Sequence, residues 1–162
     1  MNNLSTYIIE KLRINKNTNI NTEKSKYSKI YNVDENDIVM IMQGFKYKDD
    51  IYIMVYPGRI DEINDNEIEV YNINLNEKIK DIFIFNDPQK SEPINNSFAF
   101  IHNKSNGYWK ALIRKDKAID MINDTLKRYK TGNIIWFGSF KLYGKNKREN
   151  LENLLKDLND EN

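Results

Sequence analysis

Few residues in this chain have the type and spacing needed for catalysis. His102 is the only histidine and there is no cysteine, which excludes thiol catalysis, disulfide bonds and cysteine-based zinc or iron–sulfur sites. A serine could pair with His102 as a nucleophile, but no candidate lies in a Gly-x-Ser-x-Gly elbow: Ser97, Ser105, Ser139. We therefore predict no catalytic residue, no cofactor and no enzyme activity. An enzyme with carboxylate and histidine chemistry is the least favoured alternative.

Acidic residues gather in one short stretch that could in principle bind a cation: Asp61, Glu62, Asp65 and Glu67. Their spacing lacks the glycine at the sixth position and the terminal glutamate of an EF-hand loop. A single histidine does not supply the ligands of a transition-metal site. We predict that the paired acids Asp61/Glu62 and Glu67/Glu69 face solvent from strands and that this stretch binds no metal.

Basic and aromatic residues alternate between positions 102 and 148. Cations contact phosphates and exposed rings stack on bases, so this composition is typical of a nucleic-acid surface. It is equally typical of a half-buried sheet with a solvated outer face, and basic residues at a helix C-terminus also offset the helix dipole. The predicted surface for nucleic acid or an acidic partner consists of Lys110, Arg114, Lys127, Arg128, Lys130 and Lys141.

Charge is segregated along the chain although the net charge is only +1. Residues 1–30 carry a net charge of +4, residues 31–100 carry −8, residues 101–148 carry +9 and residues 149–162 carry −4. Opposite local fields can steer partners even when the whole chain is nearly neutral. The pattern predicts salt-sensitive head-to-tail self-association.

The beginning of the chain predicts a short docking helix on a tether. Residues 1–14 contain an apolar stripe at helical spacing, followed by the polar stretch 15–36. A helix of about three turns is marginal by itself, so it must dock on something. The predicted partner-docking residues are Leu4, Tyr7, Ile8 and Leu12. The alternative is an ordinary first helix packed on its own core.

This opening, Leu4-x-x-Tyr7-Ile8-x-Glu10-Lys11-Leu12-x-Ile14-x-Lys16, resembles the start of many small proteins of crAss-like phages that infect Bacteroides. The resemblance covers about a tenth of the chain. It implies a phage origin and a diverse family without shared chemistry. In such a family the opening would be a docking peptide that directs different folded domains to the same location.

The stretch from Asp37 to Asn86 predicts an antiparallel β-meander of five strands. The run 38–42 is continuously apolar, as in a strand that is buried on both faces. Pro57-Gly58 favours a tight turn between the second and third strands. The apolar phase slips by one residue at Val70/Tyr71, which predicts a β-bulge and hence a curled sheet.

This pattern, with Tyr56-Pro57-Gly58-Arg59-Ile60 leading into 63–70, resembles SH3-like barrels and the Tudor branch most of all. Tudor folds bind methylated Lys or Arg in a cage of converging rings. The resemblance implies five candidate rings, with ordinary barrel packing as the alternative: Phe45, Tyr47, Tyr52, Tyr56 and Tyr71.

A second subregion follows the proline-containing boundary 87–93. It predicts a hairpin over 98–114, a helix from Asp116 that stops at Gly132, a strand over 133–143 and a last helix with a capping-box start at Asn146 and Glu149. The expected fold is α+β: a docking helix (1–14), a tether (15–36) and one domain (37–162) that joins the meander (37–86) to a β-α-β-α segment (94–162).

No apolar run approaches the ~20 residues that span a bilayer, and the start lacks a signal-peptide pattern. We therefore expect no membrane contact. The favoured function is a non-enzymatic phage protein that acts through contacts with other phage proteins or a host protein, in the virion or the host cytoplasm. The alternative is a nucleic-acid-binding accessory protein that uses residues 102–148.

Overall fold

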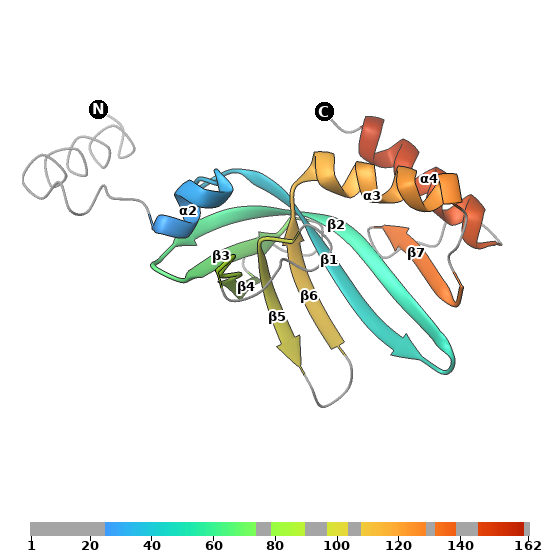
Figure 1. The fold of residues 1–162 in the computed structure, drawn as a ribbon, viewed down its shortest axis with the longest axis horizontal. Coiled ribbons are helices and arrows are strands. Elements are labelled where there is room, and N and C mark those ends of the chain that lie inside the picture. Colours follow the sequence, from blue (N-terminus) through green and yellow to red (C-terminus); the bar gives the residue numbers. More distant parts are fainter. Residues whose placement is uncertain are drawn as a thin grey trace, which may run out of the picture.

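The computed structural model describes residues 25–73, 79–89, 97–103, 108–128, 132–138 and 146–160, apart from the side chains of His102 and Asn103. The elements of this part (Figure 1) are α2 (Lys26–Tyr31), β1 (Ile38–Tyr47), β2 (Asp50–Ile63), β3 (Glu67–Asn72), β4 (Lys80–Phe85), β5 (Ala99–Asn103), β6 (Tyr108–Ile113), α3 (Lys115–Arg128), β7 (Ile134–Gly138) and α4 (Lys147–Asp160). The predicted docking helix lies outside the described residues.

Strands β1 to β6 form a closed antiparallel barrel. Each strand pairs with the next along the chain, and β6 returns to pair with β1. β7 extends the sheet by pairing in parallel with the first half of β2. The α+β class and the small curled barrel are thus confirmed. Strands β5 and β6 come from beyond the predicted boundary at 87–93, so the barrel draws on both subregions.

The predicted turn at Pro57-Gly58 is wrong, because β2 continues without a break from Asp50 to Ile63. The proline lies between the residues of β2 that pair with β7 and those that pair with β3. Its carbonyl accepts a hydrogen bond from the Ile73 N–H. The N–H that proline lacks would point to the same side as this carbonyl, toward the gap between β7 and β3. The hydrogen bonding between the strands therefore loses little at Pro57.

Gly58 serves close packing inside the barrel. An added Cβ would lie 2.6 Å from Cγ1 of Val70 and 2.7 Å from Cδ1 of Ile41. Glycine within a strand often marks such a close approach. Pro57 therefore marks the gap between the strands β7 and β3, and Gly58 marks a close contact with the barrel interior. Neither residue turns the chain.

The predicted bulge at Val70/Tyr71 is also wrong in its position. β3 alternates strictly between buried and partly exposed residues, with Val70 inside and Tyr71 outside. The register of β2 against β3 shifts instead between Ile60 and Ile63, so the irregularity lies in β2. A bulge bends its strand, as barrel closure requires.

Two apolar cores lie on the two faces of the sheet. One fills the barrel, and the other lies between the sheet and the helices α3 and α4. β1 contributes to both cores, with Val39 and Ile41 inside the barrel and Met40 and Met42 beneath the helices. The prediction of a strand buried on both faces is confirmed.

Helix α2 corrects the predicted tether, whose second half, from Ser25 onward, is structured. Its N-cap Ser25 accepts a hydrogen bond from the Tyr27 N–H, and Tyr27 and Tyr31 stack on Phe85 at 5.6 and 6.1 Å. The Tyr31 hydroxyl donates to the Asn86 carbonyl at 2.6 Å. These aromatic contacts make α2 a cap over one end of the barrel, which the polar composition of 15–36 did not suggest.

The elements of the second subregion agree with the sequence in kind. The hairpin β5–β6, helix α3, strand β7 and helix α4 are all present. Gly132 has a φ of 54°, as expected after a helix end, and the Glu149 N–H donates to Asn146 Oδ1 at 2.8 Å. Leucines of α4 pack on the outer face of the sheet.

Candidate functional site

Apolar side chains lie exposed on the outer face of β4 and β5. Ile82 is 50% exposed, Ile84 is 52% exposed and Phe100 is 37% exposed. Ile84 and Phe100 are direct cross-strand partners. Ile82 lies two residues before Ile84 on the same face of β4. We call these three residues the β4–β5 patch. An exposed apolar group of this kind is more informative than scattered single residues.

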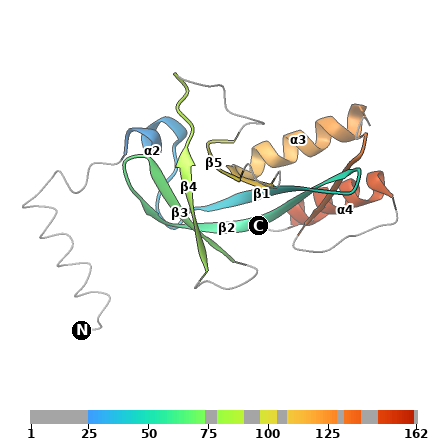
Figure 2. The ribbon, with the colours of Figure 1, turned by 90° about the horizontal axis from the view of Figure 1, so that it is seen from below.

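The patch forms because β4 is apolar on both faces while only one face is covered. Phe83 and Phe85 enter the barrel and are buried, and the alternation along the strand turns Ile82 and Ile84 outward. Helices α3 and α4 lie over the other side of the molecule, and β4 is remote from both in two perpendicular views (Figure 1 and Figure 2). No described element shields the outer face of β4.

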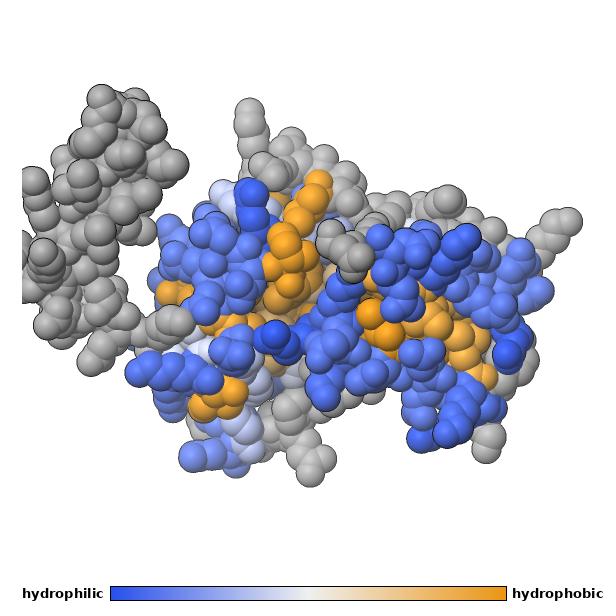
Figure 3. Space-filling model, turned by 90° about the horizontal axis from the view of Figure 1, so that it is seen from above, coloured by the Kyte–Doolittle hydropathy of each residue, from blue (hydrophilic) through white to orange (hydrophobic). Residues whose placement is uncertain are grey.

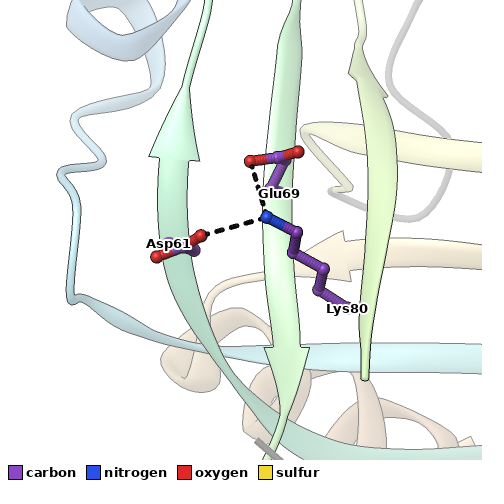
Figure 4. A network of polar contacts seen from close by, with 3 residues as sticks. All are labelled: Asp61, Glu69 and Lys80. Atoms are coloured by element: carbon purple, nitrogen blue, oxygen red, sulfur yellow. Dashed lines mark hydrogen bonds and ion pairs between the residues drawn. The ribbon is translucent and has the colours of Figure 1, made fainter. Parts of the chain in front are cut away.

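An acidic row borders the patch on β3. Glu67 is the cross-strand partner of Ile84, and Glu69 is the partner of Ile82. Lys80 Nζ lies 3.3 Å from Glu69 Oε2 and 3.4 Å from Asp61 Oδ2 (Figure 4). The hydrogen bond with Glu69 is the main reason why the pKa of Lys80 is raised. Within the described chain no ion pair involves Glu67.

The carboxylates around this ion pair do not favour a metal ion. Oxygens of Asp61, Glu62 and Glu69 lie within 4.8 Å of one another, which would suit a cation. The ammonium group of Lys80 already lies between two of these three residues and supplies the positive charge. The arrangement is explained as a surface ion-pair network.

A polar network lies in the barrel near the start of β6. Lys110 Nζ lies 2.7 Å from Asp81 Oδ2, and the Tyr56 hydroxyl donates to Gln43 Oε1 at 2.9 Å. Burial raises the pKa of Tyr56 to about 12. Burial is the largest single influence on Lys110 and disfavours its charged form, but the hydrogen bond to Asp81 together with the interactions with Tyr56 and Tyr108 outweighs it, so the pKa of Lys110 is raised. The network stabilises the barrel and leaves Lys110 with a partner inside the protein.

The five candidate cage rings separate into three groups. Phe45, Tyr47 and Tyr52 lie together, with Phe45 and Tyr52 stacked at 5.3 Å between centroids. Tyr56 is inside the barrel, and Tyr71 lies outside near Lys80. A cation held between two ring faces needs roughly twice the ring–cation distance, so rings that touch one another leave no room for it. The described geometry therefore favours barrel packing over a cage.

The predicted basic surface is divided among different faces. Lys110 points into the barrel, whereas Lys127 and Arg128 end α3 on the outer side of the sheet. Arg114 donates to the Asn32 carbonyl at 2.9 Å, and Arg128 pairs with Asp124 at 3.1 Å. Lys130 and Lys141 lie outside the described residues.

The aromatic residues of the predicted basic surface are also engaged in packing. Trp136 is buried in the core beneath the helices, and Trp109 packs against the same core. Exposed rings are what base stacking requires. The described residues thus do not form one basic aromatic surface.

A cleft of about 590 Å³ lies where β1 begins, α3 begins and α4 ends. Its apolar residues are Ile38, Val39, Ile119 and Leu158, and its rim is charged. Figure 3 shows apolar side chains between two hydrophilic bands over α3 and α4. The rim residue Arg114 is held by α2 and lies 3.9 Å from Asp116, so no convergent set of unused polar groups defines a ligand.

The sequence carries a signal for the β4 side of the β4–β5 patch. Residues 82–85 are apolar at every position, and the sequence predicts Ile82 and Ile84 on the face opposite Phe83 and Phe85. Nothing in the sequence assigns a cover to that second face. The partner-docking residues predicted instead, Leu4, Tyr7, Ile8 and Leu12, lie outside the described residues.

None of the described helices combines the length and the apolar character needed to cross a membrane. Comparison with protein-family models, with curated proteins and with solved structures finds no match to this chain.

Proposed function

We propose that this chain is a non-enzymatic phage protein that acts through protein–protein contacts, and that the β4–β5 patch is its contact surface. The supporting observation is the exposure of three adjacent apolar side chains on a sheet face that no described helix covers. Burying an apolar side chain contributes about 1.5–3 kcal/mol when it is complete. Contacts centred on such side chains dominate the affinity of protein interfaces.

The neighbours of the patch define the chemistry of the partner. Glu67 and Glu69 lie beside Ile84 and Ile82 on the adjacent strand. A partner that presents an apolar stripe next to a basic side chain would bury its stripe on the isoleucines and place its charge near Glu67. Complementary charges of this kind increase specificity and the association rate more than the affinity.

The phage origin rests on the resemblance of the opening to proteins of crAss-like phages. The partner is then another phage protein in the virion or a protein in the host cytoplasm. Self-association is a further candidate because the chain holds oppositely charged segments. The nucleic-acid alternative is less favoured, since Lys110 and Arg128 point to different sides of the sheet. The assignment to an SH3-like barrel stays a prediction.

Substitutions in the phage test this proposal. We expect Ile84→Lys to reduce the yield of infectious particles while the purified variant keeps the unfolding midpoint of the wild type, because the side chain is already exposed. Asn123→Lys on the exposed face of α3 is the matched control and should leave the yield unchanged. Equal yields for the wild type and Ile84→Lys would contradict the proposal.

A further inference from the structure

The described chain begins beside the β4–β5 patch. The hydroxyl group of Ser25 donates to the Asp65 carbonyl at 2.6 Å in the β2–β3 turn. The Asn66 carbonyl of the same turn accepts from the Phe85 N–H at 2.9 Å, and Glu67 pairs with Ile84. Residues 1–24 therefore enter the fold within a few residues of the patch.

Residues 1–14 have the composition that the patch requires. Leu4, Ile8 and Leu12 recur every fourth residue and form one stripe if the segment is helical. Lys11 follows Ile8 by three residues, so its ammonium group lies beside that stripe. The patch offers the complement, since its isoleucines border Glu67, which has no ion pair among the described residues.

The stripe is long enough to cover the whole patch. Leu4 to Leu12 spans about 12 Å along a helix, whereas Ile82 to Ile84 spans about 7 Å along β4 and Phe100 lies about 5 Å away on β5. Residues 15–24 can extend to at most about 33 Å, which is ample for a return from Ser25 to a patch on the adjoining strands. A tether of this length gives the segment a millimolar effective concentration at the patch.

We propose that residues 1–14 dock as an amphipathic helix on the β4–β5 patch of the same chain, with Lys11 facing Glu67. The inference rests on the proposed function, because the segment occupies the surface that an external partner would use. A helix this short is marginal in isolation, and the patch supplies the apolar surface that would order it. An external partner must then displace the segment.

Isoleucine methyl resonances of the full-length protein give a first test. We expect Ile8→Asp to shift the δ1 methyl signals of Ile82 and Ile84, because the stripe leaves them. Ile38 is 54% exposed at the cleft by α3 and serves as the internal control, whose signal should not move. Unchanged signals from Ile82 and Ile84 would overturn the proposal. Lys11→Glu should cause part of the same shift, and adding Glu67→Lys should reverse it.

Cysteine pairs show which copy is bound, because the natural chain has no cysteine. In dilute protein we expect Lys11→Cys with Glu67→Cys to form an intramolecular disulfide at least about tenfold faster than Lys11→Cys with Asn123→Cys. Equal rates, or a covalent dimer alone, would overturn docking within one chain. If these tests fail while Ile84→Lys still reduces phage yield, only the inference about residues 1–14 falls. If the docking tests succeed and the yield is unchanged, the proposed function falls.

Discussion

The two halves of the barrel differ in what lies outside them. Beneath α3 and α4, β1 is apolar on both faces, with Met40 and Met42 covered by the helices. On the opposite half, β4 is also apolar on both faces, but Ile82 and Ile84 remain half exposed. The two strands share a sequence pattern and differ in their environment.

This difference shows that a doubly apolar strand indicates a surface to be covered and does not identify the cover. For β1 the cover comes from residues more than seventy positions later, in α3 and α4. For β4 no described element supplies it. We propose that the covered half serves stability and the uncovered half serves recognition, and substitutions can separate the two roles.

The largest expected effect is on the covered half. Leu154→Ala removes a side chain that is 1% exposed and should lower the free energy of unfolding by about 2–5 kcal/mol. Ile84→Ala is the matched truncation on the half without a described cover and should cost no more than about 1 kcal/mol, because only a short docked segment would cover it. Urea denaturation measures both. Equal losses would mean that the patch is part of the core.

A smaller effect is expected inside the barrel, which both halves share. Gly58→Ala should lower the free energy of unfolding by about 1–3 kcal/mol, because the new methyl group would meet Val70 and Ile41. Adding Val70→Ala removes one of the clashing groups, so the double variant should lose less than the two single losses combined. Strict additivity in denaturation experiments would argue against this packing.

The polar network joins the halves, since Lys110 is on β6 and Asp81 on β4. The pKa of Lys110 and that of Tyr56, which reaches about 12, are both raised in the folded state. Their contribution is therefore complete below pH 10 and is lost as the pH rises further, by at most about 1.4 kcal/mol per pH unit and group. Tyr56→Phe should flatten this alkaline decline in pH-dependent unfolding. An unchanged decline would remove Tyr56 from the network.

The smallest effect is expected at the acidic border of the patch. Lys80→Met breaks both ion pairs of an exposed lysine and should leave the urea midpoint close to that of the wild type. The difference should shrink further in high salt, because exposed charges are screened. A clear drop in the midpoint that persists in high salt would show that the network is structural.

Much of the fold could be predicted from the sequence, because the decisive signals are local. The continuous run 38–42, the stripe of α4 and the cap at Asn146 each depend on spacing within one element. The prediction of a turn at Pro57-Gly58 was wrong because both residues also occur within strands. Proline fits where a strand lacks a hydrogen-bonding neighbour and glycine fits where another chain segment packs closely, and only the neighbouring strands show which case applies.

The bulge and the candidate site were harder to predict for the same reason. A bulge is a property of two paired strands, and the shift at Ile60 to Ile63 appears only against β3. The exposure of Ile82 and Ile84 depends on where α3 and α4 pack, which their own sequence does not state. Lys110 looked like a surface cation because its partner Asp81 is 29 residues away.

Photo-crosslinking in cells that produce this protein tests the central claim most directly. A photoreactive amino acid replaces Ile84 on the patch or, as the control, Asn123 on α3, and covalent adducts are identified by mass spectrometry. We predict that the probe at position 84 captures one defined protein that the probe at position 123 does not. Identical adduct patterns at both positions, or adducts only at position 123, would contradict the assignment of the β4–β5 patch as the contact surface.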